Sequence, residues 1–494
     1  EAKFLRAWFY FRLNELFGRE GLGVPIYTEP TSVDESNKGQ SPEADVWKLI
    51  TDDLTDAIDD PNLPNMDPNG RVTKGAAYAL RGKAYLYQGA KYKETTDGSV
   101  NVTVNTDLLN KAIADFDKVK ECGYGLFGDY KGLFSEENEH CNEMIFSIGH
   151  TDDKGYGTNS QKFVGSRFAY SGTGNGWGNQ TPAPAGIDQY EYTDGSPFNW
   201  DDIIPDYDKL TPKERAVYFL RDTLDINSEI VKQEGDQKPL ETLVRSSVKT
   251  LVEKAGKTAK EYMPYGNEIR IRKAYQNRDP RLEANIITPY AGFNGGYSFA
   301  GAGNPMVVYS RWPLGAKSKT PDVTKRADLA TDDSNYFTYF HRKFVYEGAG
   351  LSRREDGGLD EPLIRYANVL LWKAEAYVEL DKLPEAKACV KEVRDRVKMP
   401  ILDRYFFDQN SARDYVRAER RREFVNEGVD FFDEMRWYTW KEIKFNQGKG
   451  TQTVWGEVWQ SYTWPTSNNL YIWPVPQSEV ERNPNLTRTP GWNY

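Results

Sequence analysis

Histidine is the side chain that most often moves protons or binds metals near neutral pH, and this chain of 494 residues has only three. His140, His150 and His341 do not form a paired-ligand spacing such as HExxH. Two other motifs are incomplete because each lacks one glycine. A nucleophile elbow would require glycine at position 300, which is Ala300, and a phosphate loop would require glycine at position 251, which is Leu251. We therefore predict no catalytic, metal-binding or cofactor-binding residue from these motifs.

Carboxylates are the one type of potentially catalytic side chain that is abundant, because the chain contains 74 Asp and Glu residues. A pair at the right separation can hydrolyse a glycosidic bond, one member acting as general acid and the other as base or nucleophile. Their separation in space does not follow from the sequence. A glycoside hydrolase built on a helical frame is therefore the alternative function.

Aromatic residues in glycine-rich segments are the positive evidence, because Phe, Trp and Tyr make up 14% of the chain. Aromatic rings suit the apolar CH faces of pyranose sugars, and neighbouring polar side chains can bind the hydroxyl groups. The alternative is that these rings pin the loops onto the body. Two glycine-rich segments, 172–180 and 290–315, provide the predicted ligand-binding residues: Trp312, Trp177, Tyr297, Phe299, Tyr309 and Asn175.

Composition and charge exclude several other function classes. The formal net charge is −10 and the isoelectric point is near 5.2, which argues against a nucleic-acid partner. Mean hydropathy is −0.73, and no window of about 18 apolar residues exists to span a membrane. The cysteines Cys122, Cys141 and Cys389 lack metal-type spacing; three buried thiols are the favoured reading, and one disulfide stays open.

Helical periodicity dominates the two ends of the chain, which must position these loops. The first segment has one apolar stripe, which ends near Gly18 and consists of Ala2, Leu5, Phe9, Leu13 and Leu16. A second helix is predicted over 42–59, with an inward face of Val46, Leu49, Ile50, Leu54 and Ile58.

Two helix pairs follow the pattern of tetratricopeptide (TPR) repeats. Helices are predicted over 73–92 and 107–122, and again over 362–380 and 384–397. In the later pair Ala374 and Ala386 stand twelve residues apart with an aromatic residue at Tyr377, as a TPR hairpin would place them. The predicted fold is all-α: TPR-like helix pairs forming a right-handed scaffold, with a loop-rich irregular insert region.

The middle of the chain has a different character. Segments 149–200 and 289–321 are irregular and too long to be plain connectors, while 211–260 reads as helical and highly charged. We expect N-terminal TPR-like helices over 1–148, a ligand-binding insert region over 149–360, and C-terminal TPR-like helices with an extended end over 361–494. The three parts would form one intertwined domain.

A basic run at Arg420, Arg421 and Arg422 invites comparison with a phosphate site. Acidic residues stand near it at Glu419, Glu423, Glu427 and Asp433. We predict that the arginines pair with neighbouring acids and have a structural role.

Six ordered blocks resemble the SusD/RagB family of outer-membrane nutrient-binding lipoproteins. They span nearly the whole chain, and together they are far more specific than any one alone. The blocks are EAKFLRA at 1–7 with LFG at 16–18 and VPI at 24–26; GRVTKGAAYALRGKAYL at 70–86; NRDPRL at 277–282; LIRYANVLLWKAEA at 363–376; RREF at 421–424 with EG at 427–428 and FD at 432–433; and LYIWPVPQSEVERNPNL at 470–486.

The resemblance implies a non-catalytic protein, lipid-anchored on the cell surface at the outer membrane, that binds oligosaccharides or polysaccharides. It implies a SusC-like TonB-dependent transporter as partner, which the protein covers as a lid, and membrane contact only through a lipid anchor. A signal peptide, a lipidated cysteine and an N-terminal segment would precede Glu1. The aromatic loop from Tyr297 to Trp312 would contribute to the glycan platform. A TPR scaffold that binds only proteins is a third, less favoured function.

Overall fold

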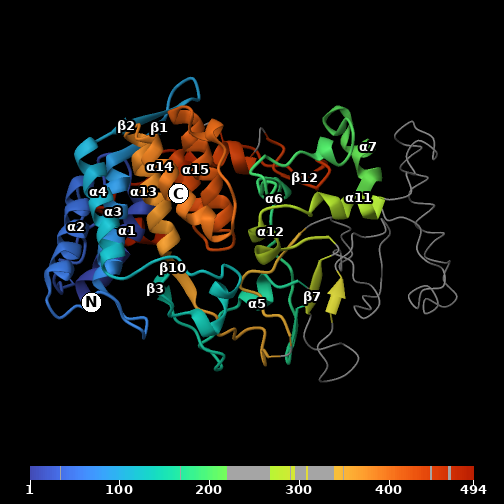
Figure 1. The fold of residues 1–494 in the computed structure, drawn as a ribbon. Coiled ribbons are helices and arrows are strands. Elements are labelled where there is room, and N and C mark those ends of the chain that lie inside the picture. The colour runs from blue at the N-terminus through green and yellow to red at the C-terminus, as the bar shows by residue number, and fades with distance from the viewer. Residues whose placement is uncertain are drawn as a thin grey trace.

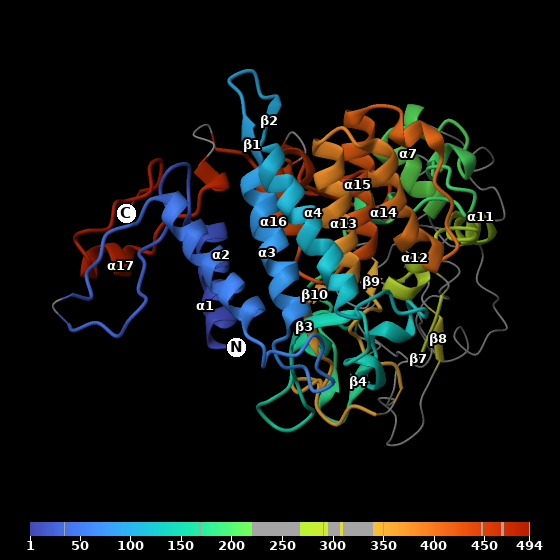
Figure 2. The ribbon, with the colours of Figure 1, turned by 60° about the vertical axis from the view of Figure 1, so that its left-hand side comes forward.

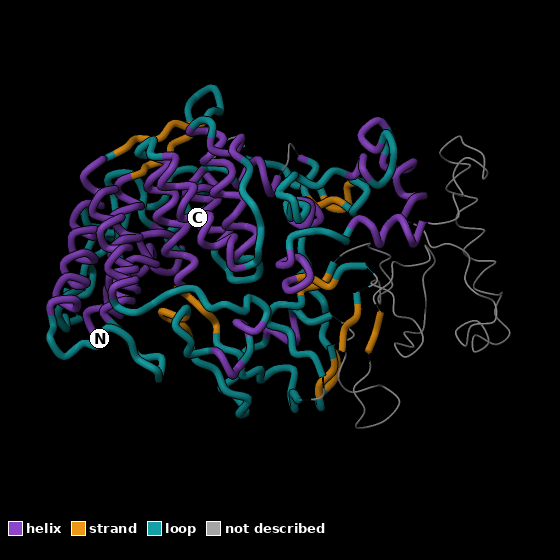
Figure 3. The backbone as a smooth tube through the Cα atoms, in the orientation of Figure 1, coloured by secondary structure: helices purple, strands orange, loops and turns teal. Residues whose placement is uncertain are grey.

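The computed structural model describes residues 1–33, 35–166, 169–219, 267–289, 291–294, 307–309, 339–348, 350–445, 448–465 and 469–493. Helices gather on one side of the molecule, and short strands and loops form the other (Figures 1 and 3). The prediction of an all-α, TPR-like body is confirmed, because long helices dominate the structure. The helical body consists of α1 (Ala2–Phe17), α2 (Glu43–Asp59), α3 (Lys74–Gly89), α4 (Thr106–Glu121), α13 (Tyr366–Glu379), α14 (Leu383–Arg396), α15 (Gln409–Glu423) and α16 (Asp430–Trp437).

Helices α3 and α4 form the first predicted hairpin. Thr73 caps α3 by accepting a hydrogen bond from the Ala76 N–H, and Asn105 caps α4 in the same way. Between them the predicted polar insert folds as an antiparallel hairpin of β1 (Ala90–Glu94) and β2 (Val100–Val104). The two helices approach closely at Gly82, where a Cβ atom would lie 2.5 Å from the ring of Phe116. Helix α13, from the far end of the chain, packs against α4.

Helix α2 buries the face that its sequence predicts. Val46, Ile50 and Leu54 are fully buried, Ile58 is nearly so, and Leu49 is half-buried. This face packs against α1 and α3. A single apolar stripe on an otherwise polar helix leaves little choice of orientation.

Helix α1 buries a different face from its predicted stripe. Leu5, Phe9 and Leu13 are exposed, with Phe9 at 62%. The buried face is a second stripe of the same helix, formed by Phe4, Ala7, Tyr10, Phe11 and Asn14. This second stripe packs on α2 and meets Phe146 of β3 (Met144–Ile148), whose ring lies 5.0 Å from that of Phe4. Two apolar stripes compete in this helix, and the pattern alone does not rank them.

The predicted helix over 362–380 is wrong at its start. Glu361–Arg365 is strand β10, which pairs antiparallel with β3 (Met144–Ile148), and α13 begins only at Tyr366. The backbone N–H of Tyr366 donates to the Glu143 carbonyl group, so the ladder continues to the first residue of the helix. Pairing with a distant strand therefore overrides the local helical pattern.

The loop region contains short elements around a second hydrophobic core, and no long helix lies in the described part of 149–219. Strands β4 and β5, β6 and β9, and β7 and β8 each form an antiparallel pair. Of the predicted charged helix over 211–260, the structure describes α7 and a following 3₁₀ turn; the rest lies outside the described residues. The elements are α5 (Ser160–Phe163), β4 (Tyr170–Ser171), β5 (Gly174–Asn175), α6 (Pro184–Asp188), α7 (Pro212–Ala216), α11 (Asn267–Ala274), α12 (Pro280–Asn285), β6 (Ile286–Ile287), β7 (Gly292–Asn294), β8 (Val307–Tyr309) and β9 (Phe340–His341).

The C-terminal segment holds a small hairpin of β11 (Thr451–Gln452) and β12 (Val458–Gln460), then α17 (Gln477–Arg482). Figure 2 shows α17 beside the loop between α1 and α2. There the Asn483 side chain donates to the carbonyl oxygen of Lys38, 2.8 Å away. All three cysteines are free thiols, which closes the alternative of a disulfide. Within the described ranges, no helix is long and apolar enough to cross a membrane.

Candidate ligand site and the charged network beside it

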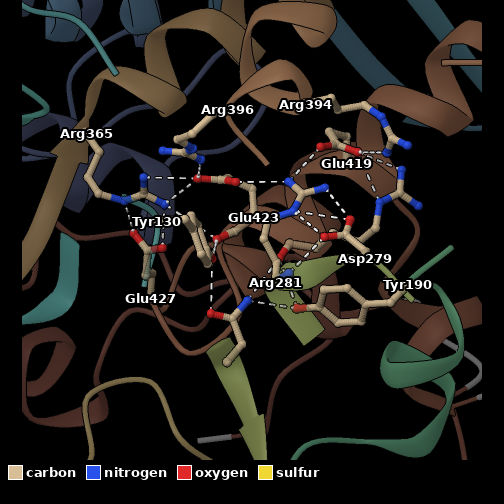
Figure 4. A network of polar contacts seen from close by, with 12 residues as sticks. Tyr130, Tyr190, Asp279, Arg281, Arg365, Arg394, Arg396, Glu419, Glu423 and Glu427 are labelled. Carbon is tan, nitrogen blue, oxygen red and sulfur yellow. Dashed lines mark hydrogen bonds and ion pairs between the residues drawn. The ribbon is translucent and has the colours of Figure 1, made fainter. Parts of the chain in front are cut away.

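A buried ion network joins the loop region to the helical body (Figure 4). The Arg281 guanidinium, at the start of α12, bonds Asp279 at 2.7 Å, Glu419 at 2.7 Å and Glu423 at 3.0 Å, and all four side chains are fully buried. Arg365 of β10 bonds Glu423 in turn, at 3.1 Å. The network therefore fixes α12 and β10 against α15.

Six cations and six acids make up this buried network. Each of the cations donates a hydrogen bond to at least one of the acids. The cations are Arg281, Lys343, Arg365, Arg394, Arg396 and Arg422, and the acids are Glu143, Glu191, Asp279, Glu419, Glu423 and Glu427.

Glu423 and Glu419, the two acids at the centre of the network, are poor candidates for acid catalysis, whereas burial raises the pKa of Glu191. Burial alone would raise the pKa of Glu423, but Arg396, Arg365 and Arg281 together lower it to about 2. The pKa of Glu419 is likewise held well below its usual value, since three arginines outweigh its burial. A general acid for glycoside hydrolysis needs a raised pKa. The network is structural.

Each arginine of the basic run of α15 pairs with an acid as predicted, but only Arg422 does so within its own helix, while Arg420 and Arg421 reach acids of α16. Arg420 bonds Asp433 at 2.6 Å, and Arg421 lies 3.3 Å from Glu434. Arg422 bonds Glu419 one turn earlier in the same helix, at 2.8 Å. The prediction of a structural role is confirmed.

Trp177 is the predicted ligand residue whose side chain the structure places. Its backbone N–H donates to the Lys162 carbonyl oxygen at 2.7 Å, which ties the segment after β5 to α5. The preceding residue must be a glycine, because a Cβ on Gly176 would lie 2.2 Å from the Gly165 carbonyl oxygen. The indole packs edge-on against Phe163, with ring centroids 5.5 Å apart, and remains 36% exposed. A rigid backbone thus presents a partly open aromatic ring.

Charged side chains surround this indole. The Lys162 ammonium lies 4.4 Å from the ring centroid and the Arg354 guanidinium 5.3 Å. Arg354 comes from the segment 351–357, whose Leu351 carbonyl accepts the Gly172 N–H, and its own N–H donates to the Thr173 hydroxyl. We call this set the Trp177 cluster; it consists of Lys162, Phe163, Thr173, Trp177, Arg354 and Glu355.

Glu355 is the acid of the Trp177 cluster. One oxygen accepts from Arg354 Nε at 2.9 Å, and the other accepts from the Thr173 hydroxyl at 3.0 Å. Burial raises its pKa, but these two hydrogen bonds outweigh burial and lower it. The carboxylate therefore stays ionised at neutral pH.

The other predicted ligand residues are placed only in part. Asn175 lies in β5 and Tyr309 in β8, both as backbone positions, while Tyr297, Phe299 and Trp312 lie outside the described residues. The hairpins β4–β5 and β7–β8 rest on the same core, which includes Val164 and Ala169 next to the first and Phe293 of the second. Figure 2 shows β4 and β7–β8 at the same end of the molecule.

Two cavities lie elsewhere and contain none of the predicted residues. The larger, about 420 Å³, lies between α1, β1, α16 and the segment around Trp473. The smaller, about 260 Å³, is lined by Glu139, His140 and Asp360 among others. Burial raises the pKa of Glu139 to about 7, and its place in a cavity makes it a carboxyl group to test for hydrolysis. Within the described ranges, no group of three or more His, Cys, Asp or Glu residues could hold a metal ion.

Comparison with known proteins decides the family. The SusD family model matches residues 142–492, more than half of the chain. The chain belongs to the SusD family. A second model, described as starch-binding associating with outer membrane, matches residues 1–86 of this SusD-family protein. The resemblance expected from the six sequence blocks is therefore confirmed.

Individual relatives of this SusD-family protein are distant. It is 26% identical over 157 residues to the SusD-like protein P25 of Formosa agariphila, a match that covers 31% of this chain and only 25% of that protein. A SusD-like protein from Bacteroides fragilis shares the fold, with a TM-score of 0.66 at 22% identity over 99% of this chain and 78% of that one.

Two solved structures with informative names share the fold as well. A laminarin binding SusD-like protein has a TM-score of 0.53 at 20% identity, covering all of this chain and 78% of that one. Surface glycan-binding protein A from Bacteroides fluxus has a TM-score of 0.56 at 18% identity, covering 99% and 77%. At these identities the likeness concerns the fold alone.

Proposed function

We propose that this SusD-family protein captures oligosaccharides or polysaccharides at the cell surface and passes them to a SusC-like TonB-dependent transporter in the outer membrane. The observation that carries the proposal is Trp177, a partly exposed indole on a rigid backbone with polar groups around it. The family membership supports it, as do the glycan ligands in the names of two structural relatives.

The chemistry of the Trp177 cluster suits a sugar. A pyranose can stack its apolar face on the free part of the indole. For ring hydroxyls the cluster offers donors from Lys162 and from the Arg354 guanidinium and acceptors from Glu355. The remaining predicted ligand residues extend this platform in the proposal: Trp312, Tyr297, Phe299, Tyr309 and Asn175.

Binding without catalysis is the proposed mode. The acids of the buried network are paired with cations and shielded from a ligand, and the lowered pKa values of Glu419 and Glu423 keep these two from donating protons. In this proposal the region 149–360 holds the ligand, while the TPR-like helices of 1–148 and 361–494 face the transporter. A lipid anchor ahead of the first helix would attach the protein to the outer membrane.

The proposal is tested by calorimetric titration of oligosaccharides into the protein and two tryptophan variants. Trp177→Ala should weaken binding by about 2 kcal/mol, or thirtyfold, as loss of a central aromatic anchor does. The matched control is Trp473→Ala, because Trp473 is equally exposed at 38% but lies on the helical side. Equal losses in the two variants, or unchanged binding in Trp177→Ala, would contradict the assigned site.

A separate assay addresses catalysis. The protein should release no reducing sugar from any glycan that it binds. Hydrolysis that disappears in the Glu139→Gln or Asp360→Asn variant would instead establish the glycoside hydrolase.

A further inference from the structure

The Lys162 ammonium lacks a hydrogen-bond acceptor in the described part of the chain. Its nearest carboxylate oxygen, on Glu355, is 3.7 Å away, beyond hydrogen-bonding distance. Both oxygens of that carboxylate already accept other bonds, from Arg354 and Thr173. The Lys162 side chain is only 21% exposed, so its charge has lost much of its hydration. The ammonium also lies over the Trp177 ring, 4.4 Å from the ring centroid.

The position of this charge matters because the ammonium lies over the partly exposed ring. A sugar stacked on Trp177 would bring its substituents beside the ammonium. The Arg354 guanidinium lies 5.3 Å from the same centroid but is paired with Glu355 at 2.9 Å, so the inference rests on Lys162. A hydrogen bond from the Lys162 ammonium to a hydroxyl group is already charge-assisted, and a negatively charged acceptor adds Coulombic attraction to it. A negatively charged substituent would therefore gain more from Lys162 than a hydroxyl group would.

We infer that the Trp177 cluster binds an anionic glycan, with a uronate carboxylate or a sulfate ester accepting hydrogen bonds from Lys162. The inference deepens the proposed function and rests on it. It adds the chemical class of the ligand, which the aromatic ring alone does not specify, since any pyranose face can stack on an indole.

The local charge contrasts with the rest of the protein. The chain carries a formal charge of −10, which repels polyanions at long range. Nearby Arg353 does not add to the site, because it is paired with Asp356 at 2.5 Å. Attraction of an anionic glycan must therefore come from contacts at the Trp177 cluster, and screening by salt should weaken it.

The test uses pairs of glycans that differ only in charge, titrated into the full chain by calorimetry. Polygalacturonate with its methyl ester tests a carboxylate, and dextran sulfate with dextran tests a sulfate ester. We expect at least one charged form to bind roughly tenfold or more tightly than its neutral partner. Lys162→Gln should reduce this ratio toward one, whereas Lys162→Arg, which keeps the charge, should retain it.

A matched control is Lys93→Gln, because Lys93 is an exposed cation paired with Glu20 on the helical side. The ratio of the affinities for the charged and the neutral glycan should be the same in Lys93→Gln as in the parent protein. Equal affinity for charged and neutral forms, or a ratio that survives in Lys162→Gln, overturns the inference and leaves the proposed function standing. Failure to bind any neutral or charged glycan contradicts the proposed function itself.

Discussion

The buried ion network and the Trp177 cluster use the same kinds of side chain for opposite purposes. In the network every cation donates to an acid, and all twelve side chains are shielded from water. In the Trp177 cluster an ammonium stands against an aromatic ring, outside hydrogen-bonding distance of its acid. Complete pairing stabilises a fold, whereas incomplete pairing at a surface leaves capacity for a ligand. Burial and pairing, more than residue type, separate the charges of the network from those of the candidate site.

The largest expected effect comes from breaking the network. Arg281→Met should lower the free energy of unfolding by about 3–5 kcal/mol, because three buried carboxylates lose their shared cation. Denaturant titration at neutral pH measures it. Arg71→Met is the control, since Arg71 forms an exposed pair with Glu1 and its loss should not change stability measurably. Similar effects in both variants would show that the network is not a special source of stability.

The second largest effect is expected from low pH, which should weaken the buried ion network. The pKa of Glu423 is about 2 in the folded protein, below its ordinary value of 4.5. Ionised Glu423 therefore stabilises the fold fully above pH 4.5, and this stabilisation is lost as the pH falls from 4.5 toward 2. The pKa shift corresponds to about 3 kcal/mol. Denaturation midpoints between pH 6 and 2 should therefore fall more steeply in the parent protein than in Glu423→Gln. Parallel pH profiles would contradict this assignment.

A smaller effect, on binding alone, is expected at Trp312. If it extends the exposed platform begun by Trp177, Trp312→Ala should cost roughly 2 kcal/mol of glycan affinity and leave the melting temperature nearly unchanged. Calorimetry and thermal unfolding on the same preparation separate the two quantities. A destabilised variant that binds normally would show that Trp312 belongs with the buried residues and not with the ligand site.

The smallest effect is expected on the open face of α1. Phe9→Ala should change the free energy of unfolding by less than about 0.5 kcal/mol, because its ring is mostly exposed. Phe11→Ala, two residues along, should cost about 3–5 kcal/mol, since that ring is fully buried against Trp47 and Tyr87. Comparable losses in these variants would contradict the observed orientation of the helix.

The sequence predicted local features better than long-range ones. The α3–α4 pair follows from periodicity and caps within a few residues, and the pairing of Arg422 with Glu419 follows from their spacing of three residues in one helix. Strand β10 forms by pairing with β3, which is more than two hundred residues away. The helical pattern of residues 361–365 therefore predicted the wrong structure. In α1 both stripes satisfy the helical period, and only the positions of α2 and β3 decide between them.

The candidate site shows the same limit. Trp177 was predicted because a lone indole in a glycine-rich segment has no helical face to join. Lys162 and Arg354 were not predicted, because nothing in their own segments links them to residue 177; only the fold brings them together. The charged run Arg353–Asp356 in a glycine-containing loop was the available sequence signal, but it does not indicate which segment the loop contacts.

The pairing of β3 with β10 and of α4 with α13 also constrains how the chain can fold during synthesis. Helices α1 to α4 leave the ribosome long before α13, yet α13 completes the core that they share. Part of the apolar surface of the first third of the chain therefore stays exposed until α13 packs on it. Contacts of such sequence separation slow folding, because a long loop has to close before they form. Closure of the helical body is thus a late event, reached only when nearly the whole polypeptide exists.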